Sequence, residues 1–226
     1  MRLGVLTGLA READCLPGQT SDMIIACAGA SPERAERLSL DLVEQGCRAL
    51  LSFGIAGALD PSLKVGDIVV ASGVIGATND VRATSDSWRN GVISILSDQV
   101  RSVSEGLIYG SDTAIASARE KSEIHQKTGA LCVDMETHRL ARVALETSTP
   151  FLVIRVISDD ANQTIPTAAL GVIGIDGKPQ IGRVLSRVLR SPWQIPALIQ
   201  LSKDMETAIV QLRRVPALLG PLFRFT

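Results

Sequence analysis

Residues 130–160 read ALCVDMETHRLARVALETSTPFLVIRVISDD, and this stretch decides the fold class. An apolar run, residues 130–133, leads into a helical pattern after Glu136, and a second apolar run covers residues 151–157. Such runs are typical of strands buried on both faces, and a helix between them is typical of a parallel crossover. The carboxylates at the junction, Asp134 and Glu136, have an ordinary explanation as acidic residues at a helix start.

The same alternation of apolar strands and helical patterns runs through most of the chain, with a glycine-containing turn expected at residues 54–60. It predicts an α/β fold in which helices flank a mostly parallel central sheet. We expect one domain over residues 1–179 and a basic amphipathic helical segment over residues 180–226. Further strands are expected at residues 2–7, 23–27, 48–53, 67–71 and 106–109, and further helices at 32–45, 85–99 and 117–129.

Composition narrows the classes of protein that fit. The chain has 226 residues, enough for one sizeable domain, and 46% of them are hydrophobic but only 3% aromatic, so the core must be largely aliphatic. Two histidines and four scattered cysteines argue against a Cys/His zinc site, and we expect no metal. No run of 18 apolar residues occurs, and the net charge of −1 does not suggest nucleic acid binding. We expect a cytoplasmic protein.

Carboxylates stand where predicted strands end. In parallel sheets ligands bind beyond the carboxyl ends of the strands. Glu12, Glu136 and the pair Asp159–Asp160 occupy such places, whereas the two histidines fall on helix faces that the periodicity exposes to solvent. A set of carboxylates can expel a base from a sugar: one acid protonates the base, one grips the sugar hydroxyls, and one activates water. Asp159 could equally cap the segment that follows it.

Three collinear stretches carry a family resemblance. VDMETHRLARVALETSTPFLVIRVISDDAN from residue 133, FGIAGALDPSLKVGDIVVA from residue 53 and GVLTGLAREAD from residue 4 resemble the purine nucleoside phosphorylase and methylthioadenosine/S-adenosylhomocysteine nucleosidase superfamily. The correspondence covers roughly residues 2–165 in order. It implies a single nucleoside phosphorylase-type domain that cleaves an N-glycosidic bond, and a homo-oligomer.

The resemblance assigns three catalytic roles. Asp159 matches the acid that protonates or hydrogen-bonds the purine N7. Glu136 matches the glutamate that holds the ribose hydroxyls, with Met135 packed beneath the sugar. Glu12 falls where the hydrolytic branch keeps its water-activating glutamate. Asp134 remains a helix cap in this interpretation.

The resemblance also implies substrate-binding positions. Gly8, Gly54 and Ser158 are expected at the mouth of the site, and Arg155 is expected to orient the acidic groups. Ala114 and Ile115 stand where the family usually has an aromatic residue that stacks on the base. We therefore expect Phe53, or a partner chain, to grip the base instead.

Phosphorolysis and hydrolysis stay open at this stage. Ser52 and Ile55 stand where phosphorylases of the family often place an arginine and a polar residue as phosphate ligands. Glu12 favours hydrolysis, although Arg11 or another arginine could bind phosphate. No cofactor is expected, and inorganic phosphate would be a co-substrate only in phosphorolysis.

The C-terminal segment has its own character. Residues 180–226 hold seven basic and two acidic residues, a net charge of +5, so the rest of the chain carries −6. Basic amphipathic helices suit an anionic membrane surface, but a helix packed on the core with its arginines outward explains the pattern equally well. RSPWQIPAL at residues 190–198 resembles the tail of hopanoid-associated phosphorylases, which release adenine from adenosylhopane.

Two other functions fit the same residues. One is a soluble methylthioadenosine/S-adenosylhomocysteine nucleosidase. The other is a non-catalytic nucleoside-binding module, against which Glu12 argues because binding alone does not need it.

Overall fold

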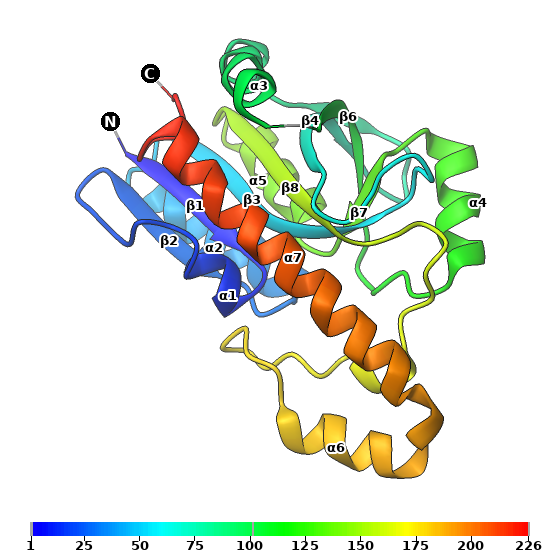
Figure 1. The fold of residues 1–226 in the computed structure, drawn as a ribbon. Coiled ribbons are helices and arrows are strands. Elements are labelled where there is room, and N and C mark those ends of the chain that lie inside the picture. The colour runs from blue at the N-terminus through cyan, green and yellow to red at the C-terminus, as the bar shows by residue number, and fades with distance from the viewer. Residues whose placement is uncertain (1, 101, 226) are drawn as a thin grey trace.

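The computed structural model describes residues 2–100 and 102–225, which form one eight-stranded sheet with helices on both faces (Figure 1). The strands are β1 (Leu3–Thr7), β2 (Met23–Cys27), β3 (Ala49–Ala58), β4 (Ile68–Ile75), β5 (Val81–Ala83), β6 (Val103–Gly110), β7 (Cys132–Asp134) and β8 (Phe151–Asp159). The helices are α1 (Ala10–Ala13), α2 (Pro32–Glu44), α3 (Asp86–Gln99), α4 (Ala118–Thr128), α5 (Thr137–Glu146), α6 (Ile181–Arg190) and α7 (Ile195–Leu219), with 3-10 turns η1 (Thr167–Ala169) and η2 (Pro192–Gln194).

The sheet closes on itself in its central part. Strand β3 pairs with β7, β7 with β6, β6 with β4, β4 with β8, and β8 again with β3. Strands β1 and β2 extend the sheet from β3, and β5 extends it from β4. Among the described strands five pairings are parallel and three antiparallel, which confirms the mostly parallel sheet.

The expected turn at residues 54–60 is wrong for most of its length. Residues 54–58 continue β3, where they pair with β8 and then with β7. The glycines in this part of β3 do not end the strand. Instead, they leave room for side chains from other segments to approach its backbone closely. Their role belongs to the site described below.

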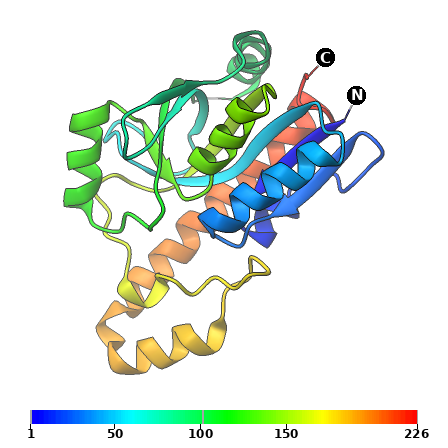
Figure 2. The same ribbon diagram turned by 180° about the vertical axis from the view of Figure 1, so that it is seen from behind.

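Helices cover the two faces with separate aliphatic clusters. Helices α3 and α7 pack on one face, and α2 and α5 pack on the other, seen from behind in Figure 2. Local signals set the helix starts: the Ser31 hydroxyl accepts a hydrogen bond from Arg34 N at 3.3 Å, and Pro32 occupies the first turn.

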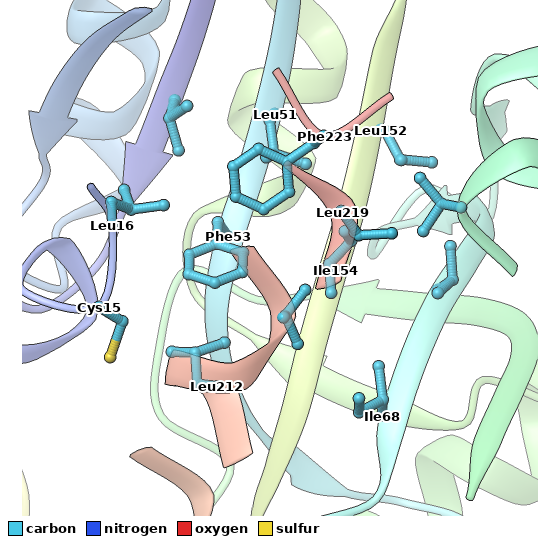
Figure 3. Close-up of a cluster of buried hydrophobic side chains, with 14 of the residues drawn as sticks. Cys15, Leu16, Leu51, Phe53, Ile68, Leu152, Ile154, Leu212, Leu219 and Phe223 are labelled. Atoms are coloured by element: carbon cyan, nitrogen blue, oxygen red, sulfur yellow. The ribbon is translucent and has the colours of Figure 1, made fainter. Parts of the chain in front are cut away.

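The C-terminal segment divides into two parts. From Ala208 onward the apolar side of α7 is buried in the core, and Phe223 beyond it contacts Phe53 edge-on, with ring centroids 5.3 Å apart (Figure 3). This part of the segment therefore belongs to the core. Helix α6, in contrast, has no buried residue between Ile181 and Arg190 and stands away from the sheet (Figure 1). Within residues 2–100 and 102–225, no helix is both long and apolar enough to cross a membrane.

Candidate active site

A cavity of about 170 Å³ opens at the carboxyl ends of β1 and β8. The three carboxylate-bearing segments predicted from the sequence all contribute to it. Gly8 comes from the β1–α1 turn and Glu12 from α1, Met135 and Glu136 come from the β7–α5 junction, and Asp159 comes from the end of β8. The remaining lining residues are Leu9, Ile55, Ala56, Gly57, Thr113, Ala114, Ile115, Val133, Asp134, Ser158 and Ile165.

Glu12 is held by three backbone N–H groups. Its Oε2 accepts hydrogen bonds from Gly8 N at 2.7 Å and Leu9 N at 2.8 Å, and its Oε1 accepts one from Ile55 N at 2.8 Å. Burial raises the pKa of Glu12, whereas the charge of Arg155 and these N–H groups act in the opposite direction. A carboxylate has about four acceptor positions, so these three hydrogen bonds leave one position on Oε1 unused.

Gly54 is the residue that makes room for Glu12. A Cβ at this position would lie 2.5 Å from Glu12 Oε1, too close for any side chain. The sequence suggested that Gly54 lines the cavity, but it does not. Its role is to leave space for the carboxylate of Glu12. Gly8 lies on the cavity wall and makes a similar close approach, with its Cβ position 2.8 Å from Glu136 Oε1.

Glu136 is a buried carboxyl with unfavourable neighbours. Burial, followed by the charges of Asp134 and Glu12, raises its pKa to about 8, although Arg155 pulls in the other direction. The group therefore exchanges its proton near neutral pH. It directly precedes α5, and its side chain does not cap the helix, so its carboxyl is available to the cavity.

The capping role falls to Asp134, as predicted. Its Oδ1 accepts a hydrogen bond from Thr137 N at 3.0 Å, and its Oδ2 accepts one from Arg155 Nε at 2.7 Å. Arg155 also donates to the hydroxyls of Ser52 at 2.6 Å and Thr137 at 2.7 Å, and to the carbonyl of Ile154 at 3.1 Å. Arg155 thus orients Asp134 and α5 from beneath the site and does not line the cavity.

Asp159 is fixed at the opposite wall. Its Oδ1 accepts a hydrogen bond from the Ser158 hydroxyl at 2.9 Å, and its Oδ2 pairs with the ammonium of Lys121. Sequence reasoning missed Lys121, because the charged sequence of α4 suggests a solvated helix. The available signal was spacing: Lys121 shares a helix face with Ile124, the apolar residue within that charged run.

The assignment of Phe53 to the base is wrong. Phe53 is fully buried, and its ring packs against Phe223 in the core below α7 (Figure 3). Side chains alternate between the two faces of a strand, so residue 53 cannot face the same side as residue 54. Ala114 and Ile115 do line the cavity.

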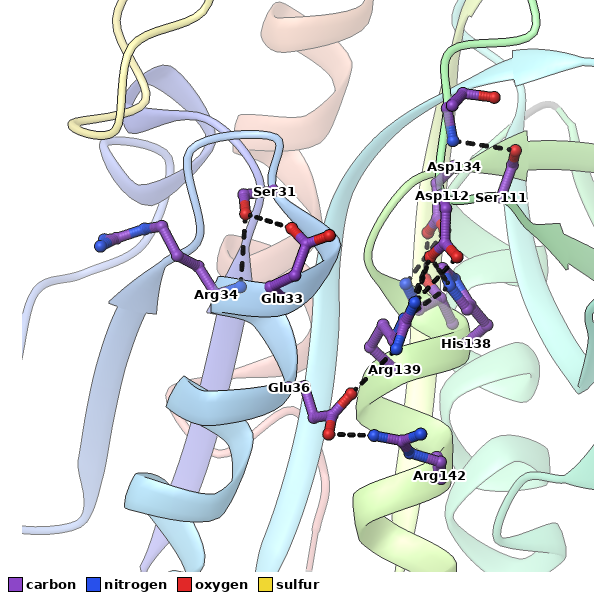
Figure 4. Close-up of polar contacts among 12 residues, drawn as sticks. Ser31, Glu33, Arg34, Glu36, Ser111, Asp112, Asp134, His138, Arg139 and Arg142 are labelled. Carbon is purple, nitrogen blue, oxygen red and sulfur yellow. Dashed lines mark hydrogen bonds and ion pairs between the residues drawn. The ribbon is translucent and has the colours of Figure 1, made fainter.

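The outer side of α5 is tied down by ion pairs (Figure 4). Arg139 bridges Asp112, at 2.7 Å, and Glu36 of α2, at 3.1 Å. His138 is not the solvated histidine that its helix position suggested. Only 14% of its side chain is exposed, and its Nε2 lies 2.8 Å from Asp112 Oδ1. These contacts fix the helix whose first residue follows Glu136.

The chain is similar in sequence to curated nucleosidases. Over 132 residues the chain is 29% identical to a 5′-methylthioadenosine/S-adenosylhomocysteine nucleosidase of Staphylococcus aureus, covering 50% of this chain and 57% of the relative. The chain thus spans little more than half the length of the curated relatives it matches.

Solved structures share the fold over nearly the whole chain. The 5′-methylthioadenosine/S-adenosylhomocysteine nucleosidase of Neisseria meningitidis superposes with a TM-score of 0.73 at 17% identity, covering 97% of this chain and 98% of that one. Futalosine hydrolase of Helicobacter pylori gives 0.68 at 18% identity, with 96% and 97% covered. Residues 18–190 match the family model of the phosphorylase superfamily, and the chain belongs to that superfamily.

Proposed function

We propose that this chain is an enzyme that hydrolyses the N-glycosidic bond of an adenine nucleoside. The observation that carries the proposal is the convergence of Glu12, Glu136 and Asp159 on one cavity from three distant segments. Water adds to C1′ as the bond from C1′ to N9 of adenine breaks. Asp159 gives a proton to N7 of the departing base, and Glu12 takes one from the attacking water.

The surroundings of each carboxyl support its role. The remaining lone pair on Glu12 Oε1 suits it to receive a proton from water, while its three N–H donors hold the group in place. Glu136, when ionised, accepts hydrogen bonds from the ribose hydroxyls and stabilises the cationic sugar of the transition state. Met135 lies beside it in the lining, where it can pack beneath the sugar.

Hydrolysis fits better than phosphorolysis. Among the described residues that line the cavity there is no lysine or arginine to bind phosphate. The Arg155 donors are engaged by Asp134, Ser52, Thr137 and Ile154, and Arg11 forms a surface ion pair with Glu206 at 2.5 Å. The backbone N–H of Ile55, a second family phosphate position, is engaged by Glu12.

For the substrate we propose an adenine nucleoside with a large apolar 5′ substituent, namely adenosylhopane of hopanoid synthesis. The support is the RSPWQIPAL motif together with the apolar surface of α6. Ile181, Leu185 and Leu189 form a stripe at i, i+4 spacing, and Trp193 continues it. Their side chains are between 58% and 83% exposed, which is unusual for residues of this type.

This apolar stripe is our proposed contact with a membrane. Arg183 and Arg190 belong to the same helix, and a helix with apolar and basic faces binds anionic bilayers. Vesicles of phosphatidylglycerol and phosphatidylcholine should co-sediment with the protein, and Leu185→Ser with Leu189→Ser should abolish most of the binding. Val210→Ser, which changes an exposed residue on α7, is the matched control. Equal binding by all three proteins would reject the membrane contact.

We also propose a homo-oligomer, in which a second copy supplies the aromatic contact to the base that the wall at Ala114 and Ile115 lacks. Light scattering of the purified chain tests this directly. A monomer that retains full activity would exclude it.

The central experiment measures adenine release from adenosylhopane in detergent, with and without phosphate, and identifies the sugar product by mass. Free ribosylhopane in both conditions is the expected result. A phosphorylated sugar that forms only with phosphate would overturn hydrolysis. Tight adenosine binding without adenine release would instead support a binding module.

A soluble methylthioadenosine/S-adenosylhomocysteine nucleosidase is the second candidate, favoured by the likeness to the Staphylococcus aureus protein. The same assay separates the two. Adenine release from methylthioadenosine at rates equal to or above those for adenosylhopane would favour the soluble function.

A further inference from the structure

Lys121 is a buried cation next to the proposed acid. It is the only buried residue of α4 and is fully inaccessible to solvent. Lysine is almost never fully buried unless its charge is paired. Its neighbours on the helix behave differently: Arg119 and Glu123 form an exposed ion pair at 2.7 Å, and Lys127 is exposed.

The ammonium group of Lys121 has all three of its donors engaged. It contacts Asp159 Oδ2, the carbonyl of Asp160 at 2.9 Å and the carbonyl of Gln163 at 3.1 Å. Asp159 is the one carboxylate among these partners. The geometry therefore directs the charge of Lys121 at a single carboxyl group.

Asp159 is in turn confined on several sides. Ser158 donates to Oδ1 and Lys121 to Oδ2, and the carboxyl lies so close to the backbone of Gly57 that a Cβ added there would be 2.9 Å from Oδ2. The carboxyl thus has one orientation, in which it lines the cavity, while Lys121 stays behind it and does not. Any effect of Lys121 on substrate must pass through Asp159.

We propose that Lys121 is a positioning residue for Asp159, an inference that rests on the proposed function. When Asp159 gives its proton to N7, a buried carboxylate forms. The ammonium of Lys121 stabilises that carboxylate without reorganisation, because it is already in place. It also keeps the carboxyl directed at the base, so that the substrate is met in reacting geometry.

The competing explanation is that Lys121 merely ties α4 to residues 159–163. If Lys121 had only this structural role, its loss would affect folding and would slow the enzyme equally in the wild-type and Asp159→Asn backgrounds. A residue that acts through Asp159 loses its effect once Asp159 can no longer transfer a proton. A double-mutant cycle distinguishes the two, because it measures whether the losses add.

The experiment uses methylthioadenosine as a soluble probe and measures kcat, KM and the thermal midpoint of the full chain. The variants are Lys121→Met, Asp159→Asn and the two combined, with Lys127→Met as the exposed control on the same helix. We expect Lys121→Met to lower kcat by about 10- to 100-fold with KM within about threefold. In the Asp159→Asn background it should cost less than about threefold. Lys127→Met should match the wild type.

Lys121→Gln covers the case in which Lys121→Met does not fold. It keeps N–H donors near Asp159 but removes the charge, so its kcat should fall while the protein stays folded. Unchanged kcat in a folded Lys121 variant would overturn the proposal, as would an equal loss in both backgrounds. Absence of adenine release by the wild type from both methylthioadenosine and adenosylhopane would instead overturn the proposed function itself, and the role of Lys121 with it.

Discussion

The carboxylate cavity and helix α6 differ in which side chains they hide from water. At the cavity Glu12, Glu136 and Asp159 are buried, each less than one-tenth exposed. At α6 the apolar residues Leu185 and Leu189 are exposed instead. Burying charge is costly unless it is paired, and exposing apolar surface forgoes the main driving force of folding. Both regions therefore depart from what stability favours, which is typical of parts of a protein that serve function.

The two regions also differ in how they are held. The cavity is fixed by hydrogen bonds from segments as distant as residues 8 and 155, whereas α6 is attached mainly through η1 and η2. Arg187 of α6 donates to the carbonyl of Leu170, beside η1. We therefore expect small changes at the cavity to have large effects, and changes on α6 to leave folding and chemistry almost untouched.

The largest effect is expected from Glu12→Gln. The amide cannot take a proton from water, so adenine release should fall by about 10²- to 10⁴-fold. Glu44→Gln, on an exposed position of α2, is the control and should retain full rate. The assay is initial adenine release at saturating substrate. A rate within threefold of the wild type would remove Glu12 from the mechanism.

Phe223→Ala tests the division of the C-terminal segment. Phe223 is fully buried against Phe53, so the free energy of unfolding should fall by about 3–5 kcal/mol. Leu189→Ala on α6, where the side chain is 83% exposed, should change it by less than about 0.5 kcal/mol. Urea unfolding followed by Trp88 fluorescence reports on this site, because Trp88 Nε1 donates to the carbonyl of Phe223 at 2.6 Å. Similar values for both variants would show that residue 223 is not part of the core.

Gly54→Ala should disturb chemistry more than stability. The added Cβ would displace the carboxylate of Glu12, and misplacement by about 1 Å can cost roughly 100-fold in rate. Gly91→Ala in α3 is the matched glycine control, because its Cβ would meet nothing within 4 Å. Comparison of kcat for the two variants checks the expectation. Full activity in Gly54→Ala would mean that Glu12 does not need its observed position.

The smallest effect concerns pH and Glu136. Its folded pKa of about 8 exceeds the ordinary value of 4.5, so between these values the folded protein holds a proton that the unfolded chain releases. The stabilisation is therefore complete below pH 4.5 and is lost as pH rises through 8. Glu136→Gln should remove this dependence.

We expect the stability of the wild type relative to Glu136→Gln to fall steadily as the pH rises from 5 to 8.5. Urea unfolding of both proteins at several pH values measures the difference. A constant difference across this range would contradict the raised pKa.

Much of the fold could be predicted from local pattern. Apolar runs located the strands around residues 23–27 and 151–157, and Ser31 with Pro32 marked the start of α2 correctly. The continuation of β3 through residues 54–58 could not be predicted, because its glycines make room for side chains that are distant in the sequence: Gly54 for Glu12 and Gly57 for Asp159. From local sequence alone, a glycine is interpreted as the end of a strand, because the distant side chain for which it makes room cannot be identified.

The candidate site could also be predicted only in part, because local pattern marks strand ends but not contacts between distant segments. Glu12, Glu136 and Asp159 were found because each stands at a strand end, and Asp134 was recognised as a cap. Phe53 was misassigned as a substitute for the aromatic residue that the family usually has at the position of Ala114 and Ile115, although strand alternation turns it to the opposite face. Lys121 was missed because its charge resembles that of its solvated neighbours.

By itself the sequence determined most of the strands, several helix starts and the chemical types at the strand ends, because these follow from side-chain size, polarity and spacing along a few residues. Tertiary structure alone decided that Glu12 accepts hydrogen bonds from three backbone N–H groups and that Lys121 faces Asp159. It also decided that α7 completes the core while α6 does not. Those features depend on contacts between segments far apart in the chain. The side chains involved become buried and hydrogen-bonded only when those segments come together in the folded chain.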